Sequence, residues 1–287
     1  MARPPKDKGT TTSIELDLDA VAARAAEVAE ESDEDIIARL RERFTILEDM
    51  TRAIKSGDIR AMILSGPPGV GKSFGVEQVL EKDGLFDNLA ERKPRYEIVK
   101  GAMSSIGLYS KLYEYSADKN ILVFDDCDGI LMEDLSLNIL KAALDTSTRR
   151  FISWNTDSRI LRSEGIPDRF EFKGGAIFIT NIKFSHVRSK KLRDHLSALE
   201  SRCHYIDLEM DTAREKMLRI KQIVGDGMLD KYDFPVDVKD EVVNFVIDNQ
   251  DKLREISLRT VLKVSDLRKS FPNNWQAMAR TTIMKRV

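Results

Sequence analysis

The sequence has little cysteine and little histidine: two cysteines and three histidines in 287 residues. Cys127 and Cys203 lie far apart, each beside an apolar run. Such a pair supplies neither a disulfide framework nor the close spacing of a metal site, and the histidines are not clustered either. We therefore expect no metal site built from these residue types, and a reducing compartment, the cytoplasm, as the location of the protein.

The sequence also lacks a strong excess of charge of either sign and any long apolar run. Its 46 lysines and arginines nearly balance 48 aspartates and glutamates, which gives a formal net charge of −2. This balance excludes a global attraction to nucleic acid, so any contact with DNA or RNA must come from a local patch. No apolar stretch approaches the length of a membrane span, and the first residues lack the hydrophobic region of a secretory signal. We expect no membrane partner.

What the sequence does contain is an alternation of short runs rich in branched or aromatic residues with helical patterns. The runs predict five strands, at 61–65, 96–100, 121–125, 176–180 and 204–208. The middle three are almost continuously apolar, which is typical of strands covered on both faces. Helical periodicity lies between them, at 74–80, 135–144 and 190–199. The alternation predicts an α/β fold in three layers, with a five-stranded parallel sheet wrapped by helices.

The strand pattern ends after Leu208, and this change suggests a domain boundary. Four segments with helical periodicity follow, at 212–224, 237–248, 258–269 and 275–285. Ahead of the sheet, Ser32 can begin a long helix that Gly57 can end. We therefore divide the chain into a flexible tail and linker (1–31), a core (32–209) and a small all-helical lid (210–287).

A glycine-rich segment follows the first predicted strand directly. Residues 66–73 read Gly-Pro-Pro-Gly-Val-Gly-Lys-Ser and match the phosphate-loop pattern G-x-x-x-x-G-K-[ST]. Glycines let the backbone curl so that successive N–H groups point into one hollow, and the helix that follows adds its positive end. Lys72 can reach the outer phosphates, and the Ser73 hydroxyl can bind Mg²⁺. The segment predicts a site for ATP with Mg²⁺; a chance glycine-rich turn is the alternative.

Two carboxylates end the third predicted strand, Ile-Leu-Val-Phe-Asp125-Asp126. In a phosphate-loop fold, Asp125 suits the Mg²⁺ shell and Asp126 suits orienting or deprotonating the attacking water. The alternative is a pair of aspartates that cap a turn. Asp128 is a third carboxylate nearby, and we interpret it as a turn residue.

These motifs, in this order, resemble the AAA+ ATPase family over residues 32 to the end. The likeness also includes the strand that ends Ile-Phe-Ile-Thr180-Asn181 and the triplet Ser201-Arg202-Cys203. It implies that Asn181 is the first sensor, which contacts the water or the γ-phosphate, and that Arg202 is the arginine finger, which reaches the nucleotide of a neighbouring subunit. Arg259 matches the second sensor, which closes the lid. Many members carry glutamate where this chain has Asp126, which is one methylene shorter.

The residues of the predicted site fall into three groups. Those expected to bind the nucleotide are Gly66, Pro67, Pro68, Gly69, Val70, Gly71, Lys72, Ser73, Phe74 and Arg259. Those expected to act in hydrolysis are Lys72, Asp126, Asn181 and Arg202. Those expected to bind Mg²⁺ are Ser73 and Asp125. Each sensor or finger has a plain alternative: a polar strand-end residue for Asn181, a surface ion pair for Arg202 and a solvated helix arginine for Arg259. Arg188 and Arg193 are weaker finger candidates.

Three further segments could contact a client. Residues 149–175 alternate apolar and polar residues around a polar loop, as a hairpin does. One AAA+ branch of motors carries an inserted hairpin at this place, and an edge pair that completes the sheet is the alternative. Residues 105–109 resemble in position the pore loop of protein-threading members, with a plain loop into a helix as the other reading. A basic cluster at 188–193 could touch phosphates or be a solvated helix face.

The resemblance implies a ring of copies of this chain, often a hexamer, that hydrolyses ATP to remodel or move a nucleic-acid or protein client. A clamp-loader-like or helicase-loader-like ATPase of DNA replication is a second reading, motivated by the Ser-Arg-Cys triplet. A third is an assembly switch that binds ATP with negligible hydrolysis, motivated by Asp126. The compact layout is similar to that of small AAA+ proteins encoded by bacteriophages.

Overall fold

A computed structural model of the chain describes residue 26 and residues 31–89, 94–184 and 187–285, with the side chains of 83–89 left out. The predicted tail and linker at 1–31 lies outside the described residues except for positions 26 and 31. None of the helices in the described ranges combines the length and the apolar character needed to cross a bilayer.

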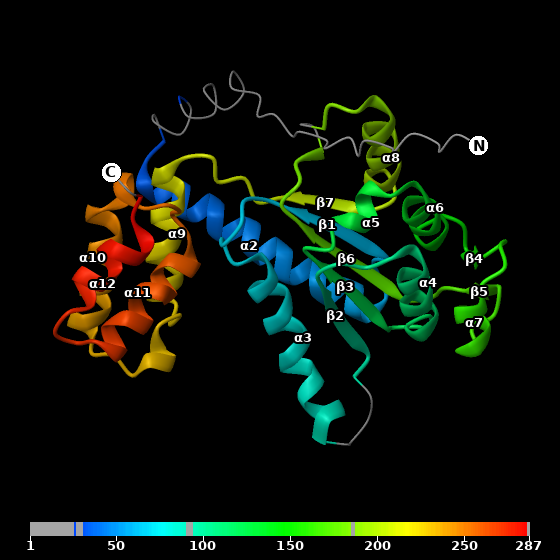
Figure 1. The fold of residues 1–287 in the computed structure, drawn as a ribbon, viewed down its shortest axis with the longest axis horizontal. Helices are drawn as coiled ribbons and strands as arrows, with labels where there is room; N and C mark the ends of the chain where they lie inside the picture. Colours follow the sequence, from blue (N-terminus) through cyan, green and yellow to red (C-terminus); the bar gives the residue numbers. More distant parts are fainter. Residues whose placement is uncertain (1–25, 27–30, 90–93, 185–186, 286–287) are drawn as a thin grey trace, which may run out of the picture.

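A five-stranded parallel sheet forms the centre of the molecule (Figure 1). Its strands are β1 (Ala61–Ser65), β2 (Tyr96–Lys100), β3 (Ile121–Asp125), β6 (Gly175–Thr180) and β7 (His204–Asp207), in the order β2-β3-β6-β1-β7. All neighbouring pairs are parallel. The predicted α/β class with five parallel strands is therefore confirmed. The apolar pattern also predicts that β2 is covered on both faces, and this is wrong. β2 lies at an edge of the sheet and is only half-buried, whereas the central strands β1, β3 and β6 are buried throughout.

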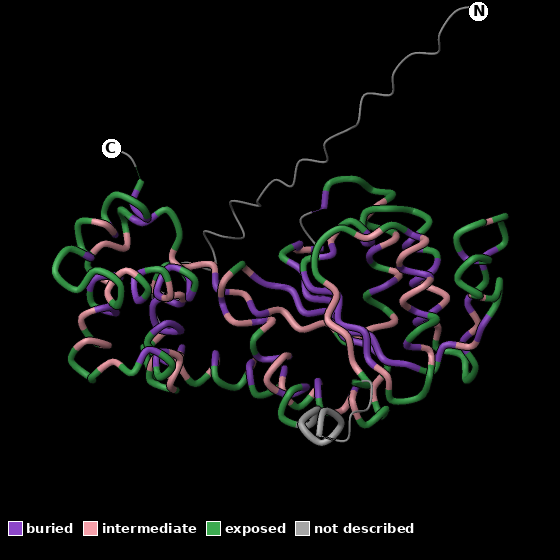
Figure 2. Tube along the Cα trace, turned by 60° about the horizontal axis from the view of Figure 1, so that its bottom comes forward, coloured by how far each residue is buried: buried purple, intermediate pink, exposed green. Residues whose placement is uncertain are grey.

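The two faces of the sheet carry two separate apolar clusters, because successive strand residues point to opposite faces. On one face, Met62, Val123 and Ile177 pack against α2 (Asp33–Ser56) and α3 (Lys72–Leu89). On the other face, Phe124 and Phe178 pack against the helices α4 (Ser105–Glu114), α5 (Gly129–Met132), α6 (Asp134–Ala143) and α8 (Lys190–Glu200). This is the three-layer arrangement that the sequence predicts. Figure 2 shows the buried residues gathered along the strands.

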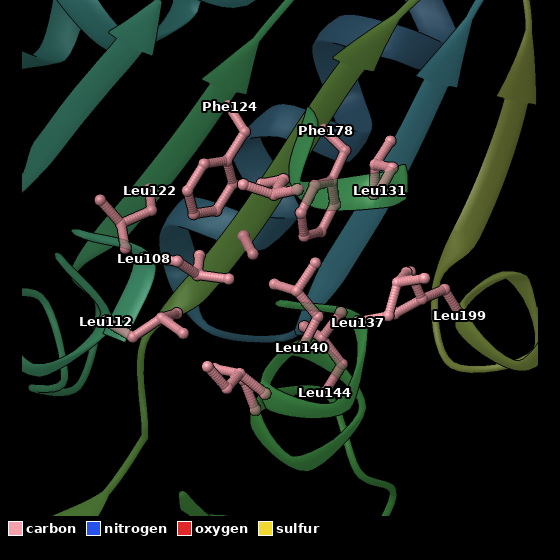
Figure 3. Close-up of a cluster of buried hydrophobic side chains, with 14 of the residues drawn as sticks. Leu108, Leu112, Leu122, Phe124, Leu131, Leu137, Leu140, Leu144, Phe178 and Leu199 are labelled. Carbon is pink, nitrogen blue, oxygen red and sulfur yellow. The ribbon is translucent and has the colours of Figure 1, made fainter. Parts of the chain in front are cut away.

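Phe124 and Phe178 lie side by side on neighbouring strands, above the leucines of α4 and α6 (Figure 3). Their rings are stacked with centroids 5.1 Å apart, and Phe178 is buried. We expect Phe178→Ala to lower the free energy of unfolding by about 3–5 kcal/mol, because it removes a ring from a closely packed layer. Urea unfolding measures this loss. Phe271→Ala, which removes a half-exposed ring, is the matched control with an expected loss of about 0.5 kcal/mol or less. Equal losses for the two variants would contradict this account of the core.

The first helix, α2, begins and ends as the sequence predicts and connects the sheet to the C-terminal helices. The Ser32 side chain accepts a hydrogen bond from the backbone N–H of Asp35. Gly57 ends the helix in the left-handed conformation, with φ at 89°. At its N-terminal end, the Arg39 guanidinium lies 3.1 Å from the buried carboxylate of Glu215 on α9. The helix therefore holds the helical unit against the core.

The C-terminal residues form an all-helical unit with an apolar cluster of its own. Its helices are α9 (Ala213–Gly225), α10 (Val236–Asp248), α11 (Leu258–Ser270) and α12 (Trp275–Ile283), with 3-10 turns at Asp230–Tyr232 and Gln250–Lys252. Figure 1 shows this unit beside the sheet, at the end of α2. All four predicted helices are present.

Residues 151–171 form a hairpin that stands apart from the main sheet, at the side opposite the C-terminal unit (Figure 1). β4 (Phe151–Ser153) pairs antiparallel with β5 (Arg169–Glu171) as a separate two-stranded sheet, with α7 (Arg159–Ser163) between them. The inserted hairpin is confirmed, and an edge pair that completes the main sheet is wrong. Arg150 fixes its base, because this buried side chain donates to the carbonyls of Ala143 and Gly174.

Both readings of 105–109, the pore loop and the plain loop into a helix, are wrong. These residues form the first turn of α4, whose N-cap is Ser104. Tyr109 is fully buried, contacts the rings of Trp154 and Phe170, and donates from its hydroxyl to the carbonyl of Pro167. The aromatic residue in this segment therefore anchors the hairpin to the core, and a client cannot reach it.

Candidate nucleotide site

The segment from Gly66 to Ser73 links the end of β1 to the start of α3, as the motif requires. Gly69 and Gly71 have positive φ values of 71° and 103°, in the region that favours glycine. At Gly69 a side chain would also collide with the C-terminal unit, since an added Cβ would lie 2.6 Å from the Cβ of Ser257. The loop therefore curls between the sheet and α11, and the open N–H groups of the first turn of α3 face the same space.

Lys72 is buried and folds back over the loop. Its Nζ donates to the carbonyls of Gly66 at 2.6 Å and Pro67 at 2.9 Å, and to the Asn181 Oδ1 at 2.8 Å. Burial lowers the pKa of this amine to about 8, while the charges of Asp126 and Asp125 act in the opposite direction. The motif lysine and the predicted sensor asparagine, which are distant in sequence, are thus in direct contact.

Asp125 and Ser73 lie together at the ends of β3 and the loop. The Ser73 hydroxyl donates to the Asp125 Oδ1 at 2.8 Å, and Lys100 lies 3.4 Å from the other carboxylate oxygen. A hydroxyl and a carboxylate are the hard oxygen ligands that Mg²⁺ takes, together with phosphate oxygens and water. The pair therefore fits the predicted cation. Among the described residues, no cluster of three His, Cys, Asp or Glu side chains forms an all-protein metal site.

Asp126 occupies a conformation that the sequence does not reveal. Its φ is 54°, in the left-handed region, and its backbone N–H donates to the Ile179 carbonyl. Aspartate and asparagine are among the few residues other than glycine that tolerate this region. The turn exposes the side chain to the cavity, where its Oδ1 accepts from the Asn181 Nδ2 at 2.9 Å. Asn181 therefore bridges Lys72 and Asp126.

Asp128 lies near Asp126 and Asn181 but does not line the cavity. Its Oδ1 accepts from the Thr180 hydroxyl at 2.6 Å, and the same hydroxyl accepts from the backbone N–H of Ile182. Burial raises the pKa of Asp128 above its usual range. This agrees with its interpretation as a turn residue, because its contacts fix the end of β6 next to Asn181.

The loop, α2, α9 and α11 enclose a cavity of about 630 Å³. Arg259 lines it at the start of α11, and the backbone N–H of Leu258 donates to the Gly69 carbonyl at 2.9 Å. Phe74, 54% exposed, lines it from the core side. Lys72, Ser73, Asp125, Asp126 and Asn181 line it as well. The structure therefore brings Pro68, Gly69 and residues 71–74 of the loop to one cavity with the acidic, first-sensor and second-sensor residues. The predicted Gly66, Pro67 and Val70 do not line it.

Arg202 is not among the residues that line this cavity, and neither are Arg188 and Arg193. It lies between α8 and β7, where its Nη1 donates to the Ala198 carbonyl at 2.5 Å and its Nε has no acceptor within the described ranges. Within one copy of the chain, the predicted finger does not meet the loop.

Sequence reasoning missed the residues that α2 and α9 bring to the cavity. Phe44, Arg219 and Gln222 line it, although no motif contains them. In the sequence, Phe44 counts only as one apolar position of an amphipathic helix, and Arg219 as one charged residue of another. Their proximity follows from the packing of α9 against α2, which a local pattern does not encode.

The strand order, the loop, the acidic strand end and the helical unit over the cavity together define an AAA+ ATPase fold. A protein of Enterobacteria phage T4, described as an uncharacterized 36.7 kDa protein in the nrdC-mobD intergenic region, is 35% identical over 256 residues, which cover 88% of this chain and 77% of that protein. The chain belongs to the same family as this phage protein. This relative is encoded by a bacteriophage, as the resemblance in the sequence predicts.

Other comparisons are more distant. No protein-family model matches the sequence. Among solved structures, NtrX from Brucella abortus in complex with ATP is 13% identical with a TM-score of 0.47, covering 88% of this chain and 57% of that one. The ORC2 protein of Aeropyrum pernix in its ADP form is 11% identical with a TM-score of 0.46, covering 86% of this chain and 67% of that one.

Proposed function

We propose that the chain binds ATP with Mg²⁺ in this cavity and hydrolyses it at the interfaces of a ring of its own copies, to remodel or move a nucleic-acid or protein client. One observation carries the proposal: Lys72, Asn181 and Asp126 form a continuous hydrogen-bonded series beside the Ser73–Asp125 pair. The series places a cation for phosphates, a polar bridge and a carboxylate at one edge of the cavity. In this proposal, residues 32–209 are the core and residues 210–287 the lid.

The loop would bind the phosphates. Lys72 exchanges its bonds to the Gly66 and Pro67 carbonyls for phosphate oxygens, and the N–H groups at the start of α3 bind the same anion. Arg259, at the head of α11, adds a second cation from the lid. Because the lid contacts Gly69 directly, occupation of the cavity is coupled to the position of the helical unit.

The cation would be held by Ser73 and Asp125, and when bound it neutralises charge on the phosphate oxygens. Asp126 is the group that accepts a proton from water, since its carboxylate faces the cavity from an exposed turn. Asn181 orients that carboxylate through its Nδ2 and keeps Lys72 in place through its Oδ1. Asp126, fixed by Asn181, would then orient the attacking water.

Arg202 would act on the nucleotide of the adjacent copy. Its place outside the cavity of its own copy supports this role, because a finger acting in trans must project from a different surface. We expect Arg202→Ala to bind ATP with unchanged affinity and to hydrolyse it about 10³-fold more slowly, since a guanidinium no longer offsets transition-state charge. Steady-state ATP turnover and equilibrium nucleotide binding measure the two effects.

Mixing two inactive variants tests the assignment in trans. In a mixed ring of Arg202→Ala and Asp126→Asn subunits, some interfaces combine an intact finger with an intact carboxylate, and we expect turnover to reappear there. Failure to recover turnover at any mixing ratio, with mixed rings verified by mass, would count against a finger that acts between copies. Arg280→Ala, on α12 and outside the cavity, is the control expected to keep full turnover.

A second function, an ATP-dependent assembly switch without hydrolysis, is favoured by the same Asp126. Its Oδ1 is already bonded to Asn181, and the aspartate side chain is short for reaching a water. If the purified ring binds ATP and shows no turnover above background, this switch replaces the ATPase.

A further inference from the structure

A second cavity, of about 310 Å³, adjoins the phosphate loop at Pro67 and Pro68. Among the described residues, Pro68 is the one that lines both this cavity and the nucleotide cavity. The remaining walls come from the C-terminal helical unit: the first turn of α9, the segment between α10 and α11, and the last described residue. A group bound in this second cavity therefore contacts the loop and the helical unit together.

Three cations line the second cavity, Lys216, Arg254 and Lys285, against one carboxylate, Glu255. Within the ranges that the structure describes, none of the three cations forms an ion pair. Cationic side chains that surround one hollow raise the local positive potential, which favours an anion there. The cavity therefore suits a ligand that carries several negative charges.

The Glu255 carboxylate does not neutralise this site. It lies next to the phosphate loop, because a Cβ added at Gly69 would be 3.3 Å from the Glu255 Oε1. Among the described side chains, no ion pair joins it to a cation either. One carboxylate against three cations leaves an excess of positive charge around the hollow.

Two of the cations are placed by a fixed frame. The backbone N–H of Arg254 donates to the Ile283 carbonyl at 3.1 Å, and that of Lys285 donates to the Lys252 carbonyl at 2.8 Å. The Arg254 Nε also donates to the Met284 carbonyl at 2.9 Å, while its Nη groups have no acceptor in the described part of the chain. The guanidinium is thus held in place and keeps donors for a further acceptor.

The chain enters the described structure beside the same turn of α9. The Asp33 carboxylate, at the start of α2, lies 2.6 Å from the Arg214 guanidinium on α9 (Figure 1). Lys216 of the cavity is two residues further along this turn. The 30 residues that precede Glu31 are therefore attached within one helical turn of a residue of the second cavity.

These preceding residues contain a matching pattern of charge. Residues 14–19 read Ile-Glu-Leu-Asp-Leu-Asp. In an extended backbone successive side chains point to opposite faces, so Glu15, Asp17 and Asp19 share one face. An extended chain from Asp19 to Glu31 spans about 40 Å. The three carboxylates match the three cations in number and are within reach of them.

We propose that residues 14–19 dock in the second cavity of the same copy, with their three carboxylates facing its three cations. The connection favours this occupant over a free anion, because a linker of this kind gives an effective concentration of about a millimolar. The docked segment contacts Pro67 and Pro68 on one side and the helical unit on the other. It therefore stabilises one position of the helical unit against the phosphate loop.

A spin label at Ser13→Cys tests the proposal in the whole chain without nucleotide. Cys127 is buried, and burial raises the pKa of Cys203 to about 12, so the new thiol takes the label first. The chain without Ser13→Cys, treated in the same way, measures any label on the other thiols. We expect the spectrum to contain a slowly tumbling population, which is the docked segment, and we expect high salt to reduce it.

Reversal of charge in the cavity is the first variant. Lys216→Glu with Lys285→Glu keeps Arg254, whose Nε fixes the C-terminal residues. We expect the ratio of slow to fast label to fall by about tenfold or more, since two attractions become repulsions. Lys221→Glu with Lys263→Glu is the matched control, because it changes the charge equally at exposed lysines that line neither cavity. We expect its spectrum to equal that of the wild-type chain.

Reversal of charge in the segment gives the rescue. Glu15→Lys with Asp17→Lys is expected to release the label from the wild-type cavity. Combined with Lys216→Glu and Lys285→Glu, the same pair is expected to restore the slow population to within about threefold of the wild-type value. A cavity variant that had lost its structure could not recover in this way.

Four results would overturn the proposal. The label could tumble equally fast in the wild-type chain and the cavity variant, or the control variant could lose the slow population as well. A slow population that disappears on dilution would place the segment on a neighbouring copy instead. Single-stranded DNA that binds the wild-type chain and not the cavity variant, with a fast label throughout, would assign the cavity to a nucleic-acid backbone. None of these results involves ATP, so the proposed function is tested separately.

Discussion

Lys72→Ala is expected to lower the affinity for ATP by at least about 100-fold. The buried amine is the cation that the loop directs at the phosphates, and each charge-assisted bond of this kind contributes about 1.5–3 kcal/mol. Removal also leaves the Gly66 and Pro67 carbonyls without their donor. Calorimetric titration with ATP and Mg²⁺ measures the loss.

Lys82→Ala is the matched control, because Lys82 is exposed on the same helix, α3, and lies outside the cavity. We expect its affinity to equal that of the wild-type chain. Thermal unfolding without nucleotide has to accompany both titrations, so that an unfolded variant is recognised. Wild-type affinity in a folded Lys72→Ala chain would remove the phosphate-loop role, and with it the proposed function.

The sequence was sufficient to predict the loop, the acidic strand end and the sheet because each is a local pattern. The turn glycines, the lysine and the serine are contiguous, and the strand that precedes them is a continuous apolar run. The role of Asn181 came only from the resemblance to the AAA+ family, and its contact with Lys72 follows from the topology, because parallel strands end at the same edge of a sheet. The contact at 2.8 Å is the outcome of that topology.

Other features depend on packing between distant segments, and the sequence could not predict them. Tyr109 reads like an exposed loop aromatic, yet the hairpin residues Trp154 and Phe170 bury it. Tyr96–Lys100 reads like a central strand and lies at an edge, because periodicity reports burial and not strand order. Arg219 meets Phe44 across 175 positions of chain, and a lone arginine on a helix carries no signal of such a partner.

Asp126→Asn is expected to abolish most ATP turnover, by about 10²–10⁴-fold, while ATP affinity changes by less than about threefold. Asparagine has the same shape and also tolerates the left-handed conformation that this position requires, with φ at 54°. Its carbonyl oxygen can still accept from the Asn181 Nδ2, so the bridge to Lys72 persists. What the substitution removes is the ability to take a proton from water. Single-turnover hydrolysis and equilibrium binding, measured on the same preparation, separate the chemical step from affinity.

Asp128→Asn gives the comparison that decides between a specific base and a general effect of charge. Asp128 is a neighbouring carboxylate bonded to Thr180, and it does not line the cavity. Its variant removes the same charge two residues away, so a general electrostatic effect would slow both variants alike. We expect Asp128→Asn to retain turnover within about fivefold, because a charge that is not in contact with water cannot accept its proton. Equal slowing of the two variants would contradict the assignment of Asp126 as the base. If the wild-type chain binds ATP without turnover, Asp126→Asn cannot lower the turnover further. That result would establish the assembly switch in place of the ATPase.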